Sequence, residues 1–425
     1  MEAETKLATG ATRDSVAVVV LLANTCLMNF GFAMLVPLLA IHFTGSLGFT
    51  AASIGLVLAL RQFSQQGLDL VGGVFADHFG ARTSIVIGCF VRAAGFAGIG
   101  TARSLAPLIL FAVVSGVGGA FFDASGTAAL ADVVAPEQRQ RVFAASSVLS
   151  NVGQAVGPLV GIALLGLSFQ LVSLAAAGCF IVIGVLTLTL LPPTLLLTTP
   201  PAMVAGNMPG AGRRSVRPTL RALRHDRAFI WLTALLAGYW FLWAQINITV
   251  PLVAIQIAGR TRGPQLAALA FAINAAPAIL LQYPAVRLFG PRYPAGLLLA
   301  ISTGLCGMGM ALVFATPLVP LFLAGVAFFA LARMLIGPLS NVVTAELAPS
   351  GMLGAYFGFG ALSVAIGAGS GQYAGGSLFD FATSHHAPLA LWGTMLAVGL
   401  VVALGLWRLR LPEREKGQMG LSSAQ

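Results

Sequence analysis

The chain of 425 residues is 58% hydrophobic and only 8% charged, whereas soluble domains carry about 25% charged residues. This composition excludes an ordinary soluble domain and indicates a protein that crosses a membrane many times. The formal net charge of +10 also raises nucleic-acid binding, but most Lys and Arg residues lie in polar segments on the side that carries both chain termini. This distribution follows the positive-inside rule and predicts cytoplasmic termini.

Long apolar runs recur along the whole sequence, and each is long enough to cross a hydrocarbon core of ~30 Å as a helix. The first run is too long for a signal-peptide core, so we interpret it as a retained span. The predicted fold is an all-α membrane protein with twelve transmembrane helices in two pseudo-symmetric six-helix bundles. The predicted spans are 16–42, 51–76, 83–102, 105–130, 141–166, 169–192, 228–256, 264–288, 293–315, 317–343, 353–377 and 387–407.

Polar side chains form a stripe in the second predicted span. Arg61, Gln65 and Asp69 follow one another at four-residue spacing, which places them close to one face of a helix. A charged group inside a bilayer costs about 2.5–3.5 kcal/mol on insertion scales, so the stripe must face protein or water. We expect Arg61 and Gln65 to contribute to a substrate-binding site, together with Asn29 in the first span.

A short polar turn, GGVFADHFGART at 72–83, separates the second span from the third. Four of its residues resemble the loop signature between helices 2 and 3 of major facilitator superfamily transporters: Gly73, Asp77, Gly80 and Arg82. His78 and Ala81 stand where that family usually has basic residues. The resemblance implies a conformational latch made of these four residues and Asp132, a carboxylate at the end of the fourth span that would pair with Arg82.

Two further charged residues lie deep in the third and fourth spans. Counted from the turn at Gly80, Asp69 and Arg92 lie at one depth, and the simplest interpretation is a structural salt bridge between them. Asp123 lies at a similar depth and has no matched cation in the adjacent hairpin arm. We therefore expect Asp123 to be the proton-coupling carboxylate, with Asp69 as the competing candidate, and we include Arg92 among the candidate substrate-binding residues.

The segment SNVGQAVGPLVG at 150–161 resembles the glycine and proline motif in helix 5 of the proton-coupled drug antiporters of this superfamily. The matching residues are Gly153, Gly157, Pro158 and Gly161. Close helix packing alone explains the glycines equally well, and Ala112 stands where the family usually has an intramembrane arginine. Two short segments, LRQFSQQGL at 60–68 and VRAAGFA at 91–97, resemble the bacterial multidrug-resistance efflux H-type branch of these antiporters.

One long polar segment, 193–227, interrupts the apolar pattern and is rich in Pro, Thr, Gly and Arg. It predicts a cytoplasmic linker between an N-terminal six-helix bundle, 1–192, and a C-terminal six-helix bundle with a cytoplasmic tail, 228–425. An internal repeat supports two halves, because ADVVAPEQRQRVF at 131–143 aligns with AELAPSGMLGAYF at 345–357. Many secondary transporters are built from repeated halves, with the substrate site near the membrane midplane between them.

Aromatic and amide side chains gather in the seventh predicted span. They are Tyr239, Trp240, Trp243 and Gln245. Such a set suits flat or amphipathic organic ligands, and Trp240 lies too deep in its span for an aromatic belt at the membrane surface. Asn274 in the eighth span and Arg333 in the tenth are further candidate substrate-binding residues.

Other functional classes have little support in the sequence. Lys6 and Lys416 are the only lysines, and neither lies in a phosphate-binding loop. The five histidines are scattered and predict no metal site, so we expect no cofactor. We therefore expect a monomeric secondary transporter, and not an enzyme, that exports amphipathic organic compounds or drugs across the inner membrane in exchange for protons.

Two alternatives stay open at this point. A carrier for organic anions or metabolites is the first, because three arginines within spans, Arg61, Arg92 and Arg333, exceed what a pump for cationic drugs needs. A membrane-embedded enzyme or receptor is the second, although the sequence shows neither a pairing of nucleophile and base nor a metal-ligand cluster.

Overall fold

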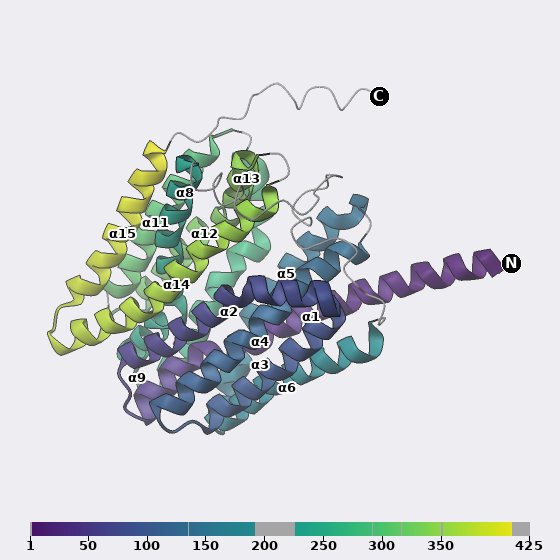
Figure 1. Cartoon of the computed structure of the whole chain (residues 1–425). Coiled ribbons are helices and arrows are strands. Elements are labelled where there is room, and N and C mark those ends of the chain that lie inside the picture. Colours follow the sequence, from purple (N-terminus) through teal and green to yellow (C-terminus); the bar gives the residue numbers. More distant parts are fainter. Residues whose placement is uncertain are drawn as a thin grey trace.

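The computed structural model describes residues 2–134, 136–191, 226–290, 292–315, 317–349 and 352–409. Over these residues the protein is all-helical, without β-strands (Figure 1). Large apolar side chains such as Trp231 and Val401 are exposed on its surface, as expected where the surroundings are lipid. The predicted all-α membrane class is confirmed.

The first half of the protein consists of six long helices joined by short turns. Gly80 joins the second helix to the third with a positive φ of 85°, a backbone conformation that glycine adopts at little cost. The helices are α1 (Glu2–Ser46), α2 (Ala51–Phe79), α3 (Ala81–Thr101), α4 (Leu105–Val133), α5 (Pro136–Leu165) and α6 (Phe169–Leu190).

The second half contains more helical pieces, because three of its membrane spans are broken. The pieces are α8 (Arg227–Ala244), the 3₁₀ helix η2 (Gln245–Asn247), α9 (Thr249–Leu280), α10 (Gln282–Phe289), α11 (Ala295–Ala315), α12 (Val319–Arg333), α13 (Ile336–Leu347), α14 (Leu353–Ser384) and α15 (Pro388–Arg408).

The helices agree with the twelve predicted spans. Nine segments of the described residues are long and apolar enough to cross a membrane. One of them, Arg227–Leu280, covers two predicted spans, and α2 and α14 correspond to the other two. The structure is therefore consistent with twelve spans, although α9 runs through the turn at Gly259, where φ is 75°.

Prolines explain the three breaks that the sequence analysis did not place. A proline in a helix removes one backbone hydrogen bond, and its ring clashes with the carbonyl four residues earlier. Pro251, Pro284 and Pro338 each follow a break by about four residues, at η2, at Leu281 and at Met334 and Leu335 respectively. These breaks let the second half bend its helices where the first half keeps them continuous.

The helices of the two halves pack in the same pattern. In the first half α1 packs on α5 and α6, α2 on α4, and α3 on α4 and α6. The second half repeats each pair at the corresponding position, with α8 on α14 and α15, α9 on α12, and α11 on α12 and α15. This correspondence is the pseudo-symmetry that the sequence repeat predicts. The exact domain boundaries stay a prediction.

The two halves meet mainly through two symmetric helix pairs, α2 with α14 and α5 with α9. We call the end of the bundle at which α6 and α8 adjoin the linker the linker end. We call the opposite end, where α1 turns into α2 and α14 into α15, the loop end. The candidate site lies nearer the linker end.

Candidate functional site

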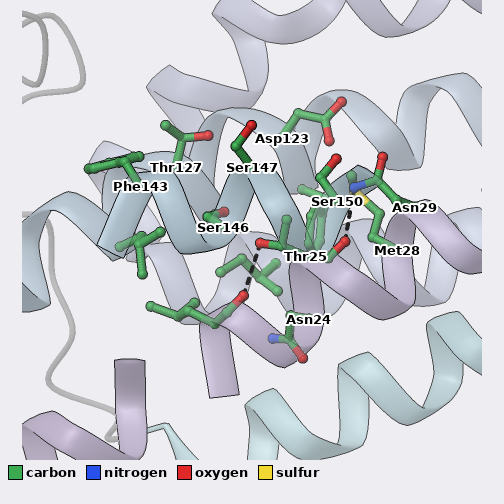
Figure 2. A pocket seen from close by; sticks show the side chains of 15 residues that line it. Asn24, Thr25, Met28, Asn29, Asp123, Thr127, Phe143, Ser146, Ser147 and Ser150 are labelled. Carbon is green, nitrogen blue, oxygen red and sulfur yellow. Dashed lines mark hydrogen bonds between the residues drawn. The ribbon is translucent and has the colours of Figure 1, made fainter. Parts of the chain in front are cut away.

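A pocket of about 450 Å³ lies inside the first half, mainly between α1, α4 and α5. Its apolar lining consists of Leu21, Met28, Ile85, Phe122, Leu130 and Phe143 beside Gly126. Its polar lining residues are Asn24, Thr25, Asn29, Asp123, Thr127, Ser146, Ser147 and Ser150. In Figure 2 the side chains of Asp123, Ser147, Ser150 and Asn29 gather on one side of α1, whereas Asn24 points away from them.

The amides of α1 are already engaged within the protein. Asn24 Nδ2 donates to Thr187 Oγ1 of α6 at 2.9 Å. Asn29 Nδ2 donates to the Thr25 carbonyl at 2.9 Å, and Asn29 Oδ1 accepts from Gln154 Nε2 of α5 at 3.2 Å. These bonds fix the wall of the pocket but leave Asn24 Oδ1 without a partner, so the groups left for a ligand are this oxygen, the hydroxyls and the carboxylate.

Asp123 is the one ionisable side chain among the residues that line this pocket. Its Oδ2 accepts a hydrogen bond from Gln65 Nε2. Gln65 Oε1 in turn accepts from Arg61 Nη1 at 2.8 Å, and Arg61 Nη2 donates to Gln62 Oε1 at 2.9 Å. Because Arg61 can only donate, it fixes the orientation of the Gln65 amide, whose NH₂ group must then face Asp123.

The sequence of α4 leaves the space that this cluster occupies. A Cβ atom added at Gly119 would lie 2.9 Å from Arg92 Nη1 and 2.9 Å from Gln65 Cδ. A Cβ atom at Gly116 would lie 2.5 Å from the Arg61 carbonyl oxygen. Glycine at both positions therefore lets α2 and α3 bring their long polar side chains against α4.

Arg92 is 2% exposed and lies among aromatic rings. Its Cζ is 5.1 Å from the Phe180 ring centroid, 5.6 Å from that of Phe32 and 5.9 Å from that of Phe96, within the range of cation–π attraction. Its Nε and Nη1 have no hydrogen-bond partner, and neither has Asp69 Oδ1. These atoms therefore do not make the direct Asp69–Arg92 bond that the sequence analysis expected.

The charged neighbours of Asp123 also differ from those that the sequence predicts. The sequence predicts no matched cation for Asp123 in the adjacent hairpin arm, but the structure places this carboxylate near both Arg92 and Arg61. A hairpin alignment could not show this, because the relevant neighbours of α4 include α2 and α3 at once.

The polar turn after α2 is held against α6. Arg82 donates through Nη2 to the carbonyl of Leu188, and Gly73 is buried. Asp132 is half-buried at the end of α4, whereas the side chain of Asp77 lies outside the part of the chain that the structure describes. The latch of Gly73, Asp77, Gly80, Arg82 and Asp132 stays a prediction.

The glycine motif of α5 packs directly on α1. Cβ atoms added at Gly153, Gly157 and Gly161 would lie 2.5, 2.6 and 2.3 Å from the carbonyl oxygens of Cys26, Phe30 and Met34. Pro158 lies inside the continuous helix α5. This spacing of one glycine per helical turn forms a groove for α1, so packing accounts for the glycines whatever their role in coupling.

Comparison with known proteins identifies the family of this chain. The model of the Major Facilitator Superfamily matches residues 21–371. The chain belongs to the major facilitator superfamily. Curated relatives include proteins named Multidrug resistance protein MdtH, from Aeromonas salmonicida at 34% identity over 388 residues and from Escherichia coli at 32% over 392 residues. These alignments cover 90% and 91% of this chain and 92% of each relative.

Solved structures of the superfamily share the fold of this transporter. The nucleoside transporter NupG superposes with a TM-score of 0.76 at 14% identity, over 93% of this chain and 100% of that one. The peptide transporter POT in complex with sulfate gives 0.75 at 18% identity, over 92% and 93%. At such identities the likeness concerns the fold alone, and it confirms the predicted fold class.

The second half of this facilitator contributes a smaller polar cluster. Arg333 Nε donates to Asn274 Oδ1 at 2.9 Å and Nη2 to the Asn274 carbonyl at 3.4 Å, and Tyr239 lies beside Arg333. A cavity of about 30 Å³ lies between this cluster and the first half. Its lining is Phe32, Ala33 and Gln154 from the first half and Trp243, Ile246, Asn247, Phe271, Asn274 and Ala275 from the second.

Two predicted substrate residues of the seventh span differ in their surroundings. Trp240 is half-buried and packs against Trp243, with ring centroids 5.4 Å apart. Gln245 is fully buried, and its amide donates to the carbonyls of Phe241 and Gly371 and accepts from Thr249. Gln245 thus links α8, α9 and α14 at the break in its own membrane span.

Sequence reasoning did not find several residues of the two cavities. Ser146, Ser147 and Ser150 line the larger pocket, and their spacing on one helical face was a signal that could have been used. Gln154 lies within the glycine motif and was not considered for binding. Phe32 lines the smaller cavity and lies 4.8 Å from Arg61 Cζ, but nothing in the sequence distinguishes it from other phenylalanines.

Proposed function

We propose that this transporter exports amphipathic organic compounds, including drugs, across the inner membrane in exchange for protons. Support comes from its membership of the superfamily and from relatives that are named multidrug resistance proteins. In this proposal the protein acts as a monomer of two bundles, 1–192 and 228–425, joined by the linker 193–227. Both termini and the linker are cytoplasmic, because most Lys and Arg residues lie on that side.

The observation that carries the proposal is the Asp123 carboxylate in the wall of the larger pocket. Gln65 binds its Oδ2, which leaves Oδ1 for a proton or a ligand group. A charged carboxylate inside a bilayer is costly unless it has a partner. A side chain that gains a proton when it loses a positively charged partner can therefore couple the two movements.

Asp69 is the competing proton carrier. It lies on the same helix as Gln65, is half-buried, and its Oδ1 has no hydrogen-bond partner. It does not line the larger pocket. We therefore keep Asp123 as the residue at which proton and substrate compete and assign Asp69 a supporting role.

An organic anion is the alternative substrate. Arg92 favours it, because this side chain has two nitrogen atoms without a partner. Against it, neither Arg61 nor Arg92 belongs to the lining of the two described cavities, whereas Asp123 does. A ligand in the larger pocket therefore meets a carboxylate before it meets a guanidinium group.

The test uses the full protein in everted vesicles with an acidic lumen. We expect accumulation of the cation ethidium in wild type. Asp123→Asn should abolish this gradient-driven accumulation but keep exchange down a substrate gradient, because asparagine resembles the permanently protonated acid. If Asp123→Asn still accumulates ethidium while Asp69→Asn does not, the two roles are reversed. Accumulation of carboxyfluorescein in place of ethidium would favour the organic-anion alternative.

A further inference from the structure

The two halves are joined at the loop end by a carboxylate that no sequence motif singled out. Asp380, near the end of α14, accepts hydrogen bonds from two backbone amides at the start of α2. Its Oδ1 is 3.0 Å from Ala51 N and its Oδ2 is 2.8 Å from Ala52 N. The residues are more than 320 positions apart in the sequence and belong to different halves.

This contact completes a helix cap that the first half leaves incomplete. The first N–H groups of a helix have no acceptor within the helix, and they carry partial positive charge. Thr50 satisfies one of them from its own half, because its Oγ1 accepts from Ser53 N at 3.1 Å. Asp380 satisfies two more from the opposite half, so the cap of α2 is complete only while the halves touch at the loop end.

The backbones of α2 and α14 lie unusually close around this carboxylate. A Cβ atom added at Gly376 would be 2.2 Å from the Ala51 carbonyl oxygen. A Cβ atom added at Gly55 would be 2.4 Å from the Gln372 carbonyl oxygen. Asp380 itself is half-buried, so the charge is partly shielded from water where it meets the two amides.

We propose that Asp380 is a positioning residue of the transport cycle, which holds the loop end shut by capping α2 and releases that helix when the loop end opens. The larger pocket lies toward the linker end, so the closed contact and the pocket are at opposite ends of the first half. Transport between the two sides requires the halves to rock around a central site. Opening the loop end then exposes both the carboxylate and the two amides to water.

The proposal rests on the fold of the transporter and on neither the substrate nor the coupling ion. If Asp123 does not couple protons to transport, the role of Asp380 is unaffected. If Asp380 does not hold the loop end shut, drug export is unaffected. The two ideas are separated because one concerns the chemistry inside the pocket and the other the distance between the halves.

The experiment measures that distance in the full-length protein. The four free cysteines, Cys26, Cys89, Cys179 and Cys306, are first replaced by serine or alanine. Spin labels are then attached through Arg103→Cys in the first half and His386→Cys in the second, two exposed positions in loop-end turns. Pulsed electron–electron double resonance then gives the populations of short and long distances between the two spin labels in liposomes.

We expect the short distance to dominate in the labelled protein that retains Asp380. Asp380→Ala should raise the ratio of open to closed protein about tenfold, which corresponds to about 1.4 kcal/mol. Asp380→Asn should give a smaller shift, because asparagine retains one acceptor oxygen for the amides. It also guards against misfolding, since it keeps the size of the side chain.

Thr50→Ala is the matched control, because it removes a cap from the same helix without touching the other half. It should leave the distance populations unchanged. An unchanged distribution in both Asp380 variants would overturn the proposal. So would a shift in Thr50→Ala as large as that in Asp380→Ala, because the effect would then come from the stability of α2 and not from the contact between halves.

Discussion

At the scale of single residues, the charge cluster of the first half is held together by a neutral side chain. Gln65 connects the guanidinium group of Arg61 to the carboxylate of Asp123. Removing one partner of a buried polar group leaves the other with an uncompensated desolvation penalty, which exceeds the net value of the bond. Gln65 therefore supports two charged residues at once.

The variant Gln65→Leu tests this arrangement. It should lower the free energy of unfolding by about 2–4 kcal/mol, because it leaves both Arg61 Nη1 and Asp123 Oδ2 without a partner. Gln62→Leu is the control, since Gln62 is also buried and accepts only one bond from Arg61. It should cost about 1–2 kcal/mol. Unfolding followed in detergent measures both, and equal losses would contradict the bridging role of Gln65.

At the scale of helices, close approach between backbones determines how the elements fit. There is little hydrophobic driving force between helices in lipid, so small residues that let backbones touch supply much of the packing. The glycines of α5 show this most directly, because each faces a carbonyl oxygen of α1. Their spacing seats α1 along about two turns of α5.

We expect Gly157→Ala to destabilise the protein by about 1–3 kcal/mol, because the added methyl group overpacks a filled contact. Its Cβ would lie 2.6 Å from the Phe30 carbonyl oxygen, and backbone atoms cannot move aside as a flexible side chain can. Gly178→Ala in α6 is the matched control, since a Cβ there meets nothing within 4 Å. A thermal shift in detergent should separate the two, and equal melting temperatures would argue against the groove.

At the scale of the whole molecule, two symmetric helix pairs carry the contact between the halves. The contact of α2 with α14 at the loop end is shaped by glycines on both helices, and the contact of α5 with α9 borders the small cavity that contains Gln154 and Asn274. A transporter with this arrangement works only if the loop-end contact can both form and separate.

Gly376→Val should therefore prevent the loop end from closing and abolish transport. The added Cβ would lie 2.2 Å from the Ala51 carbonyl oxygen, a steric block that leaves the Asp380 carboxylate itself unchanged. Ser377→Val is the control, because Ser377 is half-buried and its hydroxyl only bonds to its own helix at Tyr373. Drug accumulation in vesicles measures the effect. Wild-type rates in Gly376→Val would show that closure does not need this contact.

The sequence by itself determined the class of the protein and the course of its helices. In lipid every backbone polar group must be bonded within the protein, so a long apolar run predicts a helix whatever its neighbours are. The same holds for the turn at Gly80, whose glycine matches the positive φ found there. The superfamily could be inferred because its motifs are local stretches of sequence.

The tertiary structure alone decided which side chains meet. The sequence of an apolar helix does not fix how the helix is rotated about its axis. Packing between helices sets this rotation and with it the partners of each buried polar group. Asp123 thereby lies beside Gln65 and the arginines, Gln245 bonds within its own half, and Asp380 reaches α2. The last contact joins residues from different halves, and only the assembled bundle brings them together.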